Sequence, residues 1–305
     1  GLKLGVAYSR IDVLFPLSEP PVRCLPIPII GYIYDLQHLH MPHFFSIEER
    51  LARNKNFLLL TQVTDSIIFN SSYMSKEFHS YFESYRMDSV FCLPFAPQAR
   101  AEWLYDQGYS LQILDGSRDY IIVCNQFWVH KNHKVVLEAF DKISDLINFD
   151  LVFTGEIHDY RGTAHIEYFR ERLRLMPNSG RVHLIGCVDK SQQISLLKRA
   201  ALLVQPSEYE GGPGGGSVFD AISLGIPVLL SDIEVNKECT SPWFIDFFAV
   251  NDPIQLADKI LEFIDLFYTR KQVDVESLIC TTERSKNAVA FKLLQAVSHV
   301  ISKSS

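Results

Sequence analysis

The chain has 305 residues, of which 47% are hydrophobic and 21% are charged, and its formal net charge is −7. This length allows two domains with separate cores, and the composition is ordinary for a globular protein. The acidic balance and the lack of a dense stripe of lysine and arginine argue against nucleic acid as a partner, because binding a phosphate backbone needs a basic face.

The six cysteines are scattered and form no C-x-x-C pair, and four of them lie in or beside apolar runs. Reduced, buried cysteine is typical of such positions, so the pattern favours a cytoplasmic setting. No apolar run reaches the ~18 residues needed to cross a bilayer, and no secretory signal opens the sequence. Peripheral membrane contact stays open, because residues 41–50 bring Phe44 and Phe45 close to charged side chains.

Strand-like and helix-like segments alternate along almost the whole chain. We expect a first set of strands at residues 12–15, 28–34, 66–70 and 89–95. We expect a second set at residues 120–124, 150–154, 181–185, 201–205, 227–231 and 244–250. Helical periods occupy residues 46–65, 131–147, 160–176, 191–200 and 253–269. Continuous apolar strands separated by helices predict α/β architecture with parallel sheets covered on both faces.

The pattern of strands and helices predicts two domains joined by a linker. The N-terminal domain is predicted at residues 1–97, the linker at 98–118 and the C-terminal domain at 119–280. A helix in residues 281–305 should pack across a domain surface, through an apolar side with Ala288, Ala290, Phe291, Leu294, Val297 and Ile301. Two doubly wound domains would face a cleft, and ligands of such sheets bind beyond the carboxyl ends of the strands.

A glycine-rich loop, PSEYEGGPGGGSVFD at residues 206–220, lies between an apolar strand and a helical pattern. Glycine lets backbone N–H groups approach an anion, and the helix N-terminus adds about half a positive charge there. A flexible linker is the alternative, but linkers do not interrupt a strand–helix unit. Glu208 and Glu210 would repel a phosphate, so we expect them to bind hydroxyl groups instead. The sequence therefore predicts a site for a nucleotide sugar.

Four segments together resemble retaining glycosyltransferases of the GT-B fold, in particular glycosyltransferase family 4. They are residues 34–46, 125–133, 181–188 and 206–238. The resemblance implies two Rossmann-like domains and the transfer of a sugar, with retention of configuration and without a metal, from a UDP- or GDP-linked donor. It implies a sugar or lipid-linked sugar as the acceptor, and a role in polysaccharide or glycoconjugate synthesis. The first domain is shorter than such relatives have, so we expect it to be incomplete at its N-terminus.

The resemblance also implies roles for residues of the second domain. Glu210 matches a glutamate that faces the transferred sugar, and Lys131 matches a lysine that binds the donor diphosphate. Asn125 stands where an arginine is usual, so one cation is missing. Backbone groups near Val188 are implied to line the base pocket. The residues of the glycine loop implied to bind the donor are Gly211, Gly212, Gly214, Gly215, Gly216 and Ser217.

Asp220 has two interpretations. The family places a second acid after the glycine loop to hold the ribose hydroxyls, and Asp220 is the candidate, although it lies ten positions after Glu210 instead of the usual eight. Alternatively, Ser217 and Asp220 form a variant of the capping box, in which the acid satisfies an exposed N–H at the start of a helix. The sequence leaves both open.

In the first domain, Asp35 and His38 are the candidates for positioning the acceptor. Relatives often carry a histidine just before this aspartate, where this chain has Tyr34. His38, His40 and His43 could also be metal ligands, but no cysteine or acid pair accompanies them, and we expect no metal. Purely structural histidines are equally consistent with the sequence.

Two rival functions remain. A catalytically degenerate subunit that only binds a nucleotide sugar is favoured by Asn125, Tyr34 and the position of Asp220. A phosphorylase or an epimerase of the same fold is the other, because fold alone does not determine function.

Overall fold

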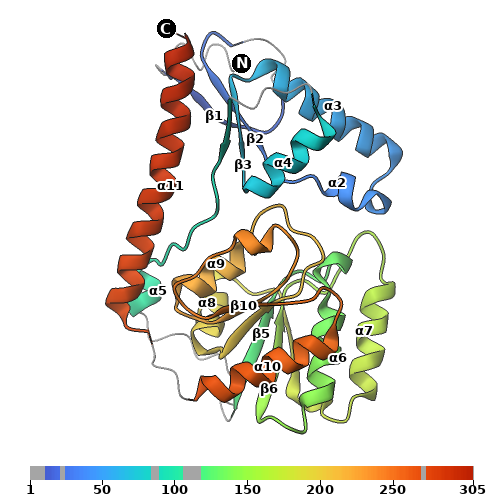
Figure 1. Ribbon diagram of the computed structural model, residues 1–305. Coiled ribbons are helices and arrows are strands. Elements are labelled where there is room, and N and C mark those ends of the chain that lie inside the picture. Colours follow the sequence, from blue (N-terminus) through green and yellow to red (C-terminus); the bar gives the residue numbers. More distant parts are fainter. Residues whose placement is uncertain (1–10, 21–24, 84–88, 106–117, 269–272, 305) are drawn as a thin grey trace. The chain divides into compact units, whose positions relative to one another are not determined.

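The computed structural model describes residues 11–20, 25–83, 89–105, 118–268 and 273–304 (Figure 1). The chain forms two compact units. The first comprises Gly1–Ala96, Glu210–Pro213 and Lys286–Ser305, and the second comprises Pro97–Tyr209 and Gly214–Ser285. Each unit contains one parallel sheet, which confirms the predicted α/β class.

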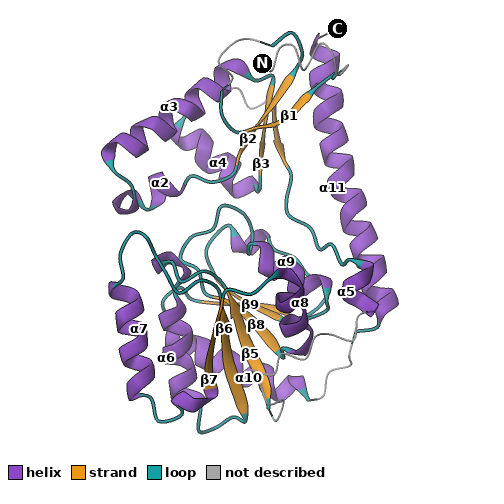
Figure 2. Cartoon of the chain, turned by 180° about the vertical axis from the view of Figure 1, so that it is seen from behind, coloured by secondary structure: helices purple, strands orange, loops and turns teal. Residues whose placement is uncertain are grey.

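The sheet of the first unit has the strand order β1-β2-β3-β4. Its strands are β1 (Leu14–Leu17), β2 (Ile29–Ile33), β3 (Ser66–Phe69) and β4 (Val90–Cys92). Helices α3 (Ile47–Val63) and α4 (Ser72–Tyr81) cover one face, where Phe57 and Phe78 pack against Phe69 (Figure 2). The short helices α2 (Gln37–His40) and η1 (Pro42–Phe44) follow β2.

The start of α3 carries a reciprocal cap. Ser46 Oγ accepts a hydrogen bond from the Glu49 N–H (3.1 Å), and the Glu49 carboxylate accepts one from the Ser46 N–H (2.7 Å). This capping box satisfies two donors that the helix itself cannot satisfy. Helix α4 lay outside the predicted elements, because its buried apolar stripe is short and rests mainly on Met74 and Phe78.

The long C-terminal helix α11 (Val275–Ser304) covers the other face of this sheet. Its buried residues Ala296 and Val300 pack against Ile30 and Ile68. The predicted apolar side is wrong in part, because Phe291 and Leu294 are each 62% exposed. The helix carries apolar residues on two faces, and the face that packs is the one on which small Ala296 permits close approach to the sheet.

The sheet of the second unit has the strand order β10-β9-β8-β5-β6-β7. Its strands are β5 (Asp119–Cys124), β6 (Phe149–Thr154), β7 (Val182–Gly186), β8 (Leu202–Gln205), β9 (Val228–Ser231) and β10 (Ile245–Phe248). One face packs on α6 (His133–Ile143), α7 (Ala164–Leu175) and α10 (Pro253–Phe267). The other packs on α5 (Ala101–Tyr105), α8 (Lys190–Arg199) and α9 (Gly216–Ser223). Among its described residues the unit also contains the short helices η3 (Val129–Lys131), η4 (Ser179–Arg181) and η5 (Asn236–Glu238).

Helix α5 lies inside the predicted linker 98–118, of which residues 106–117 fall outside the described ranges. The sheet order reverses direction between β5 and β8, because β6 and β7 extend it on one side and β9 and β10 on the other. Ligands of doubly wound sheets bind where the order reverses, beyond the carboxyl ends of the strands. A ligand site is therefore expected at the loops that follow β5 and β8.

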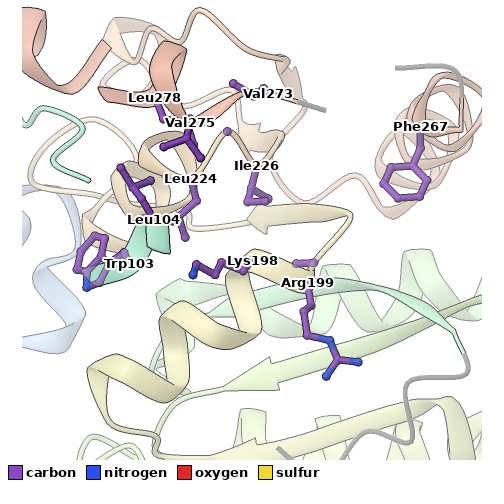
Figure 3. A pocket seen from close by; sticks show the side chains of 12 residues that line it. Trp103, Leu104, Lys198, Arg199, Leu224, Ile226, Phe267, Val273, Val275 and Leu278 are labelled. Carbon is purple, nitrogen blue, oxygen red and sulfur yellow. The ribbon is translucent and has the colours of Figure 1, made fainter. Parts of the chain in front are cut away.

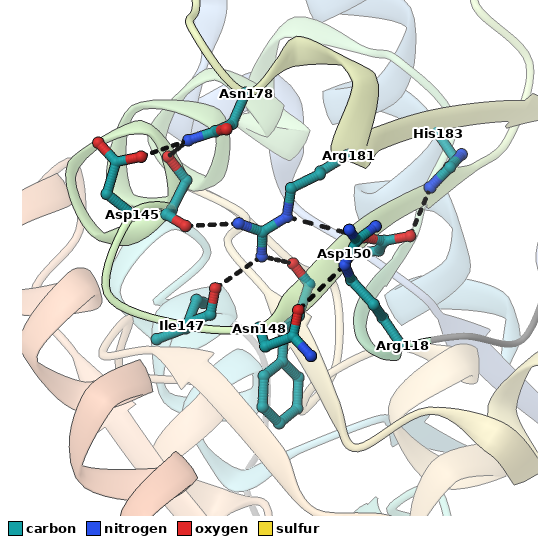
Figure 4. A network of polar contacts seen from close by, with 10 residues as sticks. Arg118, Asp145, Ile147, Asn148, Asp150, Asn178, Arg181 and His183 are labelled. Carbon is teal, nitrogen blue, oxygen red and sulfur yellow. Dashed lines mark hydrogen bonds and ion pairs between the residues drawn. The ribbon is translucent and has the colours of Figure 1, made fainter.

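A network of polar contacts around Arg181 lies at the opposite, amino edge of this sheet (Figure 4). The Arg181 guanidinium donates to the carbonyl oxygens of Ser144, Ile147 and Phe149 and lies beside the Asp150 carboxylate. His183 Nε2 lies 2.8 Å from the other oxygen of Asp150. Arg181 thus connects the C-terminal end of α6, the turn after it and the first residue of β6.

Replacing Arg181 with alanine should destabilise the second unit by about 3 kcal/mol, because the largely buried Asp150 and the carbonyl groups of the turn lose a charged donor. Urea unfolding measures the difference. Arg174→Ala is the control, since Arg174 is an exposed residue that pairs with Glu171 on its own helix. Equal stability of the two variants would contradict a structural role for the network.

Candidate functional site

The carboxyl ends of β5 and β8 are joined by a pair of amide side chains. Asn125 follows β5 and donates from Nδ2 to Oε1 of Gln205, the last residue of β8 (2.7 Å). Gln205 Nε2 in turn donates to Ser207 Oγ (3.3 Å). The position at which the sequence resemblance implies an arginine therefore carries a neutral side chain that connects two strands.

Lys131 ends the short helix η3, and one residue, Asn132, separates it from α6. Its backbone N–H donates to the Trp128 carbonyl oxygen (2.9 Å). Asn132, which links η3 to α6, has a φ of 52°, a left-handed conformation that asparagine tolerates better than most residues. A cation at the N-terminus of a helix is electrostatically unfavourable, so the stability of α6 does not explain Lys131.

The buried residue His130 connects three loops of the carboxyl edge. Its carbonyl oxygen accepts a hydrogen bond from the Glu208 N–H in the loop after β8 (2.8 Å). Its Nδ1 lies 3.5 Å from Nη1 of Arg161, which belongs to the loop after β6. Burial and then the nearby cations Lys131 and Arg161 lower the pKa of His130 to about 3, so its ring is neutral at pH 7.

The glycine loop enters α9 in a left-handed conformation. Gly214 and Gly215 have φ values of 65° and 78°, and a Cβ on Gly214 would approach Val218 to 2.8 Å. Helix α9 begins at Gly216 with Gly215 as its N-cap, and no described side chain caps it. The capping-box interpretation of Ser217 and Asp220 is therefore wrong, because Ser217 already lies inside the first turn.

Asn236 in η5 holds the glycine loop and was not identified from the sequence. Its Oδ1 accepts a hydrogen bond from the Gly214 N–H (2.9 Å), and its Nδ2 donates to the Ser231 carbonyl oxygen at the end of β9 (2.9 Å). Asn236 is fully buried. The loop is thus fixed to the neighbouring strand, which is the order that an anion-binding loop requires.

Asp220 forms an ion pair with Lys190, the first residue of α8, and its side chain is 13% exposed. Val188 lies between β7 and α8, two residues after Gly186, whose φ is 79°. Both residues belong to segments at the carboxyl edge of the sheet, as the resemblance implies. Their contacts with a ribose and a base remain predictions.

In the first unit, Arg53 of α3 joins the two predicted acceptor residues. Its guanidinium pairs with the Asp35 carboxylate and donates from Nε to His38 Nδ1 (3.2 Å). His38 Nε2 lies 2.7 Å from Asn54 Oδ1, so both ring nitrogens of this buried histidine have partners. Burial lowers the pKa of His38. Arg53 was not identified from the sequence, because its partners lie fifteen and eighteen positions away.

Glu210, Gly211 and Gly212 lie in the segment Glu210–Pro213, which groups with the first unit. Glu210 is 8% exposed. The first unit thereby contains the predicted sugar-facing acid as well as Asp35 and His38. Gly214, Gly215, Gly216 and Ser217 belong to the second unit, together with Lys131.

Within the described residues, no three His, Cys, Asp or Glu side chains are arranged to hold a metal ion. His40 Nε2 lies 2.8 Å from the Glu77 carboxylate, which gives this histidine a partner inside the first unit. Among the helices that the structure describes, none is both long and apolar enough to span a membrane.

The second unit also has a cavity of about 500 Å³ at the amino edge of its sheet (Figure 3). Its walls include Trp103, Lys198, Leu224 and Ile226. Lys198 precedes β8 and Leu224 precedes β9, so the cavity lies at the opposite end of these strands from the glycine loop. It is not part of the candidate site.

Comparisons with solved structures identify proteins of similar fold. A glycosyltransferase from Rickettsia africae is similar in structure, with a TM-score of 0.70 at 13% identity, over 98% of this chain and 79% of that chain. Anabaena HepE in complex with UDP and glucose gives a TM-score of 0.62 at 14% identity, over 91% and 70% of the two chains. Sucrose-phosphate synthase from Thermosynechococcus elongatus gives 0.67 at 14% identity, over 91% and 69%.

These likenesses show the fold, two Rossmann-like domains as in GT-B glycosyltransferases. No curated protein sequence matches the chain. Residues 112–274, just over half of the chain, match the family described as "Glycosyl transferases group 1". The matched region contains the loops after β5, β6 and β8 and the glycine-rich start of α9. The chain belongs to the family of group 1 glycosyl transferases.

Proposed function

We propose that the chain transfers a sugar from a UDP- or GDP-linked donor to a hydroxyl group of a sugar or lipid-linked sugar acceptor, with retention of configuration. Such an enzyme of glycosyltransferase family 4 would act in polysaccharide or glycoconjugate synthesis. The observation that carries the proposal is the hydrogen bond between the Glu208 N–H and the His130 carbonyl oxygen. It joins the loop after β8 to the loop that carries Lys131, at the reversal of strand order.

The donor diphosphate would bind to Lys131 and to the first N–H groups of α9. An ammonium group and backbone donors stabilise the negative charge that develops on a departing diphosphate, and they are fixed before the reaction starts. Because no described side chain caps α9, its first N–H groups and the positive end of its dipole are suited to an anion. These groups supply the positive charge, so the proposed reaction does not call for a metal ion.

The two acids would bind hydroxyl groups of the donor. Glu210 would face the transferred sugar, and Asp220 would accept hydrogen bonds from the ribose. The ion pair with Lys190 orients the Asp220 carboxylate on α9, and a carboxylate oxygen accepts hydrogen bonds from hydroxyl groups. Anabaena HepE, a protein of similar fold, has been crystallised with UDP and glucose, and this supports a UDP-linked donor.

Retention follows if the acceptor attacks the face from which the diphosphate leaves. The departing phosphate oxygen then takes the proton from the acceptor hydroxyl, so no protein nucleophile is required. Asp35 would position the acceptor, and the Arg53 guanidinium fixes this carboxylate in place. His38 would support the same group, since Arg53 also donates to its Nδ1. Close placement of the two reactants lowers the barrier by removing their freedom to move apart.

A catalytically degenerate subunit that binds a nucleotide sugar is the second candidate. The observation that favours it is Asn125, whose side chain is bound to Gln205 and supplies no charge to the diphosphate. Binding of a nucleoside diphosphate without any transfer activity would support this alternative.

The nucleotide specificity can be measured by thermal unfolding with UDP, GDP, ADP and TDP. We expect UDP or GDP to raise the melting temperature, because a ligand that binds only the native state stabilises it by about 2.7 kcal/mol at a hundredfold excess over its Kd. A melting temperature that none of the four raises would refute the donor site.

Glu210→Ala should reduce sugar transfer by about a hundredfold or more while changing nucleoside diphosphate affinity by less than about threefold, since the acid contacts the sugar and not the nucleotide. Transfer is measured as nucleoside diphosphate release in the presence of an acceptor extract. Glu262→Ala removes an acid on the exposed side of α10 and is the matched control. An equal loss of nucleotide affinity and transfer would assign Glu210 to nucleotide binding instead.

A further inference from the structure

The proposed donor carries two phosphate groups, yet Lys131 is the one cation that the resemblance assigns to them. Asn125 has a neutral side chain, which contributes no charge and is hydrogen-bonded to Gln205. Diphosphate recognition usually combines several charge-assisted donors. A diphosphate site at the carboxyl edge of the second sheet is therefore expected to use a further cation.

Arg161 lies in the loop between β6 and α7, and its guanidinium reaches the segment that carries Lys131. Its Nη1 is 3.5 Å from Nδ1 of His130, the residue directly before Lys131. The guanidinium carbon lies 5.4 Å from the centre of the Trp128 ring and 5.0 Å from that of Tyr160, and Nε donates to the Tyr160 hydroxyl (3.1 Å). Two aromatic faces and one imidazole thus orient the group, and a stacked arginine keeps its charge.

Asp159 fixes this loop to the Lys131 segment. Its Oδ2 accepts a hydrogen bond from the Val129 N–H and its Oδ1 accepts one from the Arg161 N–H, each 3.0 Å long. The Asp159 side chain is fully buried, and His165 Nε2 lies 3.7 Å from it. One carboxylate therefore holds the backbones of both loops, so the positions of Arg161 and Lys131 are set together.

Both Lys131 and Arg161 lie close enough to the buried His130 ring to lower its pKa. Burial makes the largest contribution to its low pKa, and the positive charges of Lys131 and Arg161 lower the pKa further. Two cations that both act on one buried ring create a region of positive potential, which a bound anion would neutralise. The loop after β8 reaches the same residue through the Glu208 N–H.

We propose that Arg161 binds the diphosphate of the donor together with Lys131, and so supplies the cation that position 125 lacks. The inference rests on the proposed function, since it concerns the ligand of the same site. The planar guanidinium offers paired donors that match phosphate oxygens, which an ammonium group does not. Arg161 is on this account a donor-binding residue that reaches the site from the loop after β6.

The test is calorimetric titration of the wild-type chain and of Arg161→Gln, Arg161→Lys and Arg174→Gln with UDP, GDP, uridine and guanosine. Arg161→Gln should weaken binding of the preferred diphosphate by about tenfold or more, because a charge-assisted hydrogen bond is lost. Affinity for the nucleoside should change by less than about threefold. Arg161→Lys keeps the charge but loses the paired donors, so it should lose less diphosphate affinity than Arg161→Gln. Arg174, about 15 Å along α7 from its start, should have no effect.

Three outcomes would overturn the proposal. Unchanged diphosphate affinity in Arg161→Gln refutes the contact and leaves the proposed function intact. An equal loss for nucleoside and diphosphate, or a loss in Arg161→Lys as large as in Arg161→Gln, assigns Arg161 a structural role in its loop. Absence of diphosphate binding by the wild-type chain refutes both this inference and the proposed function.

Discussion

The hydrogen bond between Asn125 and Gln205 lies at the reversal of strand order on which the site of the second unit depends. Strands β5 and β8 are neighbours in the sheet although about eighty residues separate them in sequence. The loops that follow them are consequently brought together beyond their carboxyl ends. An arginine at position 125 would have supplied charge here, whereas asparagine supplies a rigid link between two strands.

Buried polar residues turn these neighbouring loops into one ordered surface. Asp159 accepts from the backbone of two loops, His130 receives contacts from two more segments, and Asn236 holds Gly214. Each of them is buried, so breaking these hydrogen bonds would leave polar groups without water. The side chains proposed to meet the donor are therefore supported by residues that need not touch it, which is the arrangement that preorganises a charged site.

The strands, the sheet type and the glycine loop could be predicted because their signals are local. Buried parallel strands are continuous apolar runs, and each predicted strand overlaps an observed one. The packed face of α11 was mispredicted because the helix has two apolar faces and only the tertiary structure selects one. His130, Arg161 and Asn236 escaped prediction for a similar reason: what distinguishes them is a partner many residues away. The sequence suggested that Asp220 binds a ribose or caps a helix. Its ion pair with Lys190 could not be predicted, because the two residues are thirty positions apart.

Hydrogen–deuterium exchange, measured with and without the nucleoside diphosphate that binds best, shows whether this ligand binds at the carboxyl edge of the second sheet. We expect slower exchange in residues 126–132, 156–163 and 214–218, where backbone N–H groups would face or support the ligand. Slower exchange confined to residues 198–200 and 224–226, around the cavity at the amino edge, would contradict binding at the carboxyl edge.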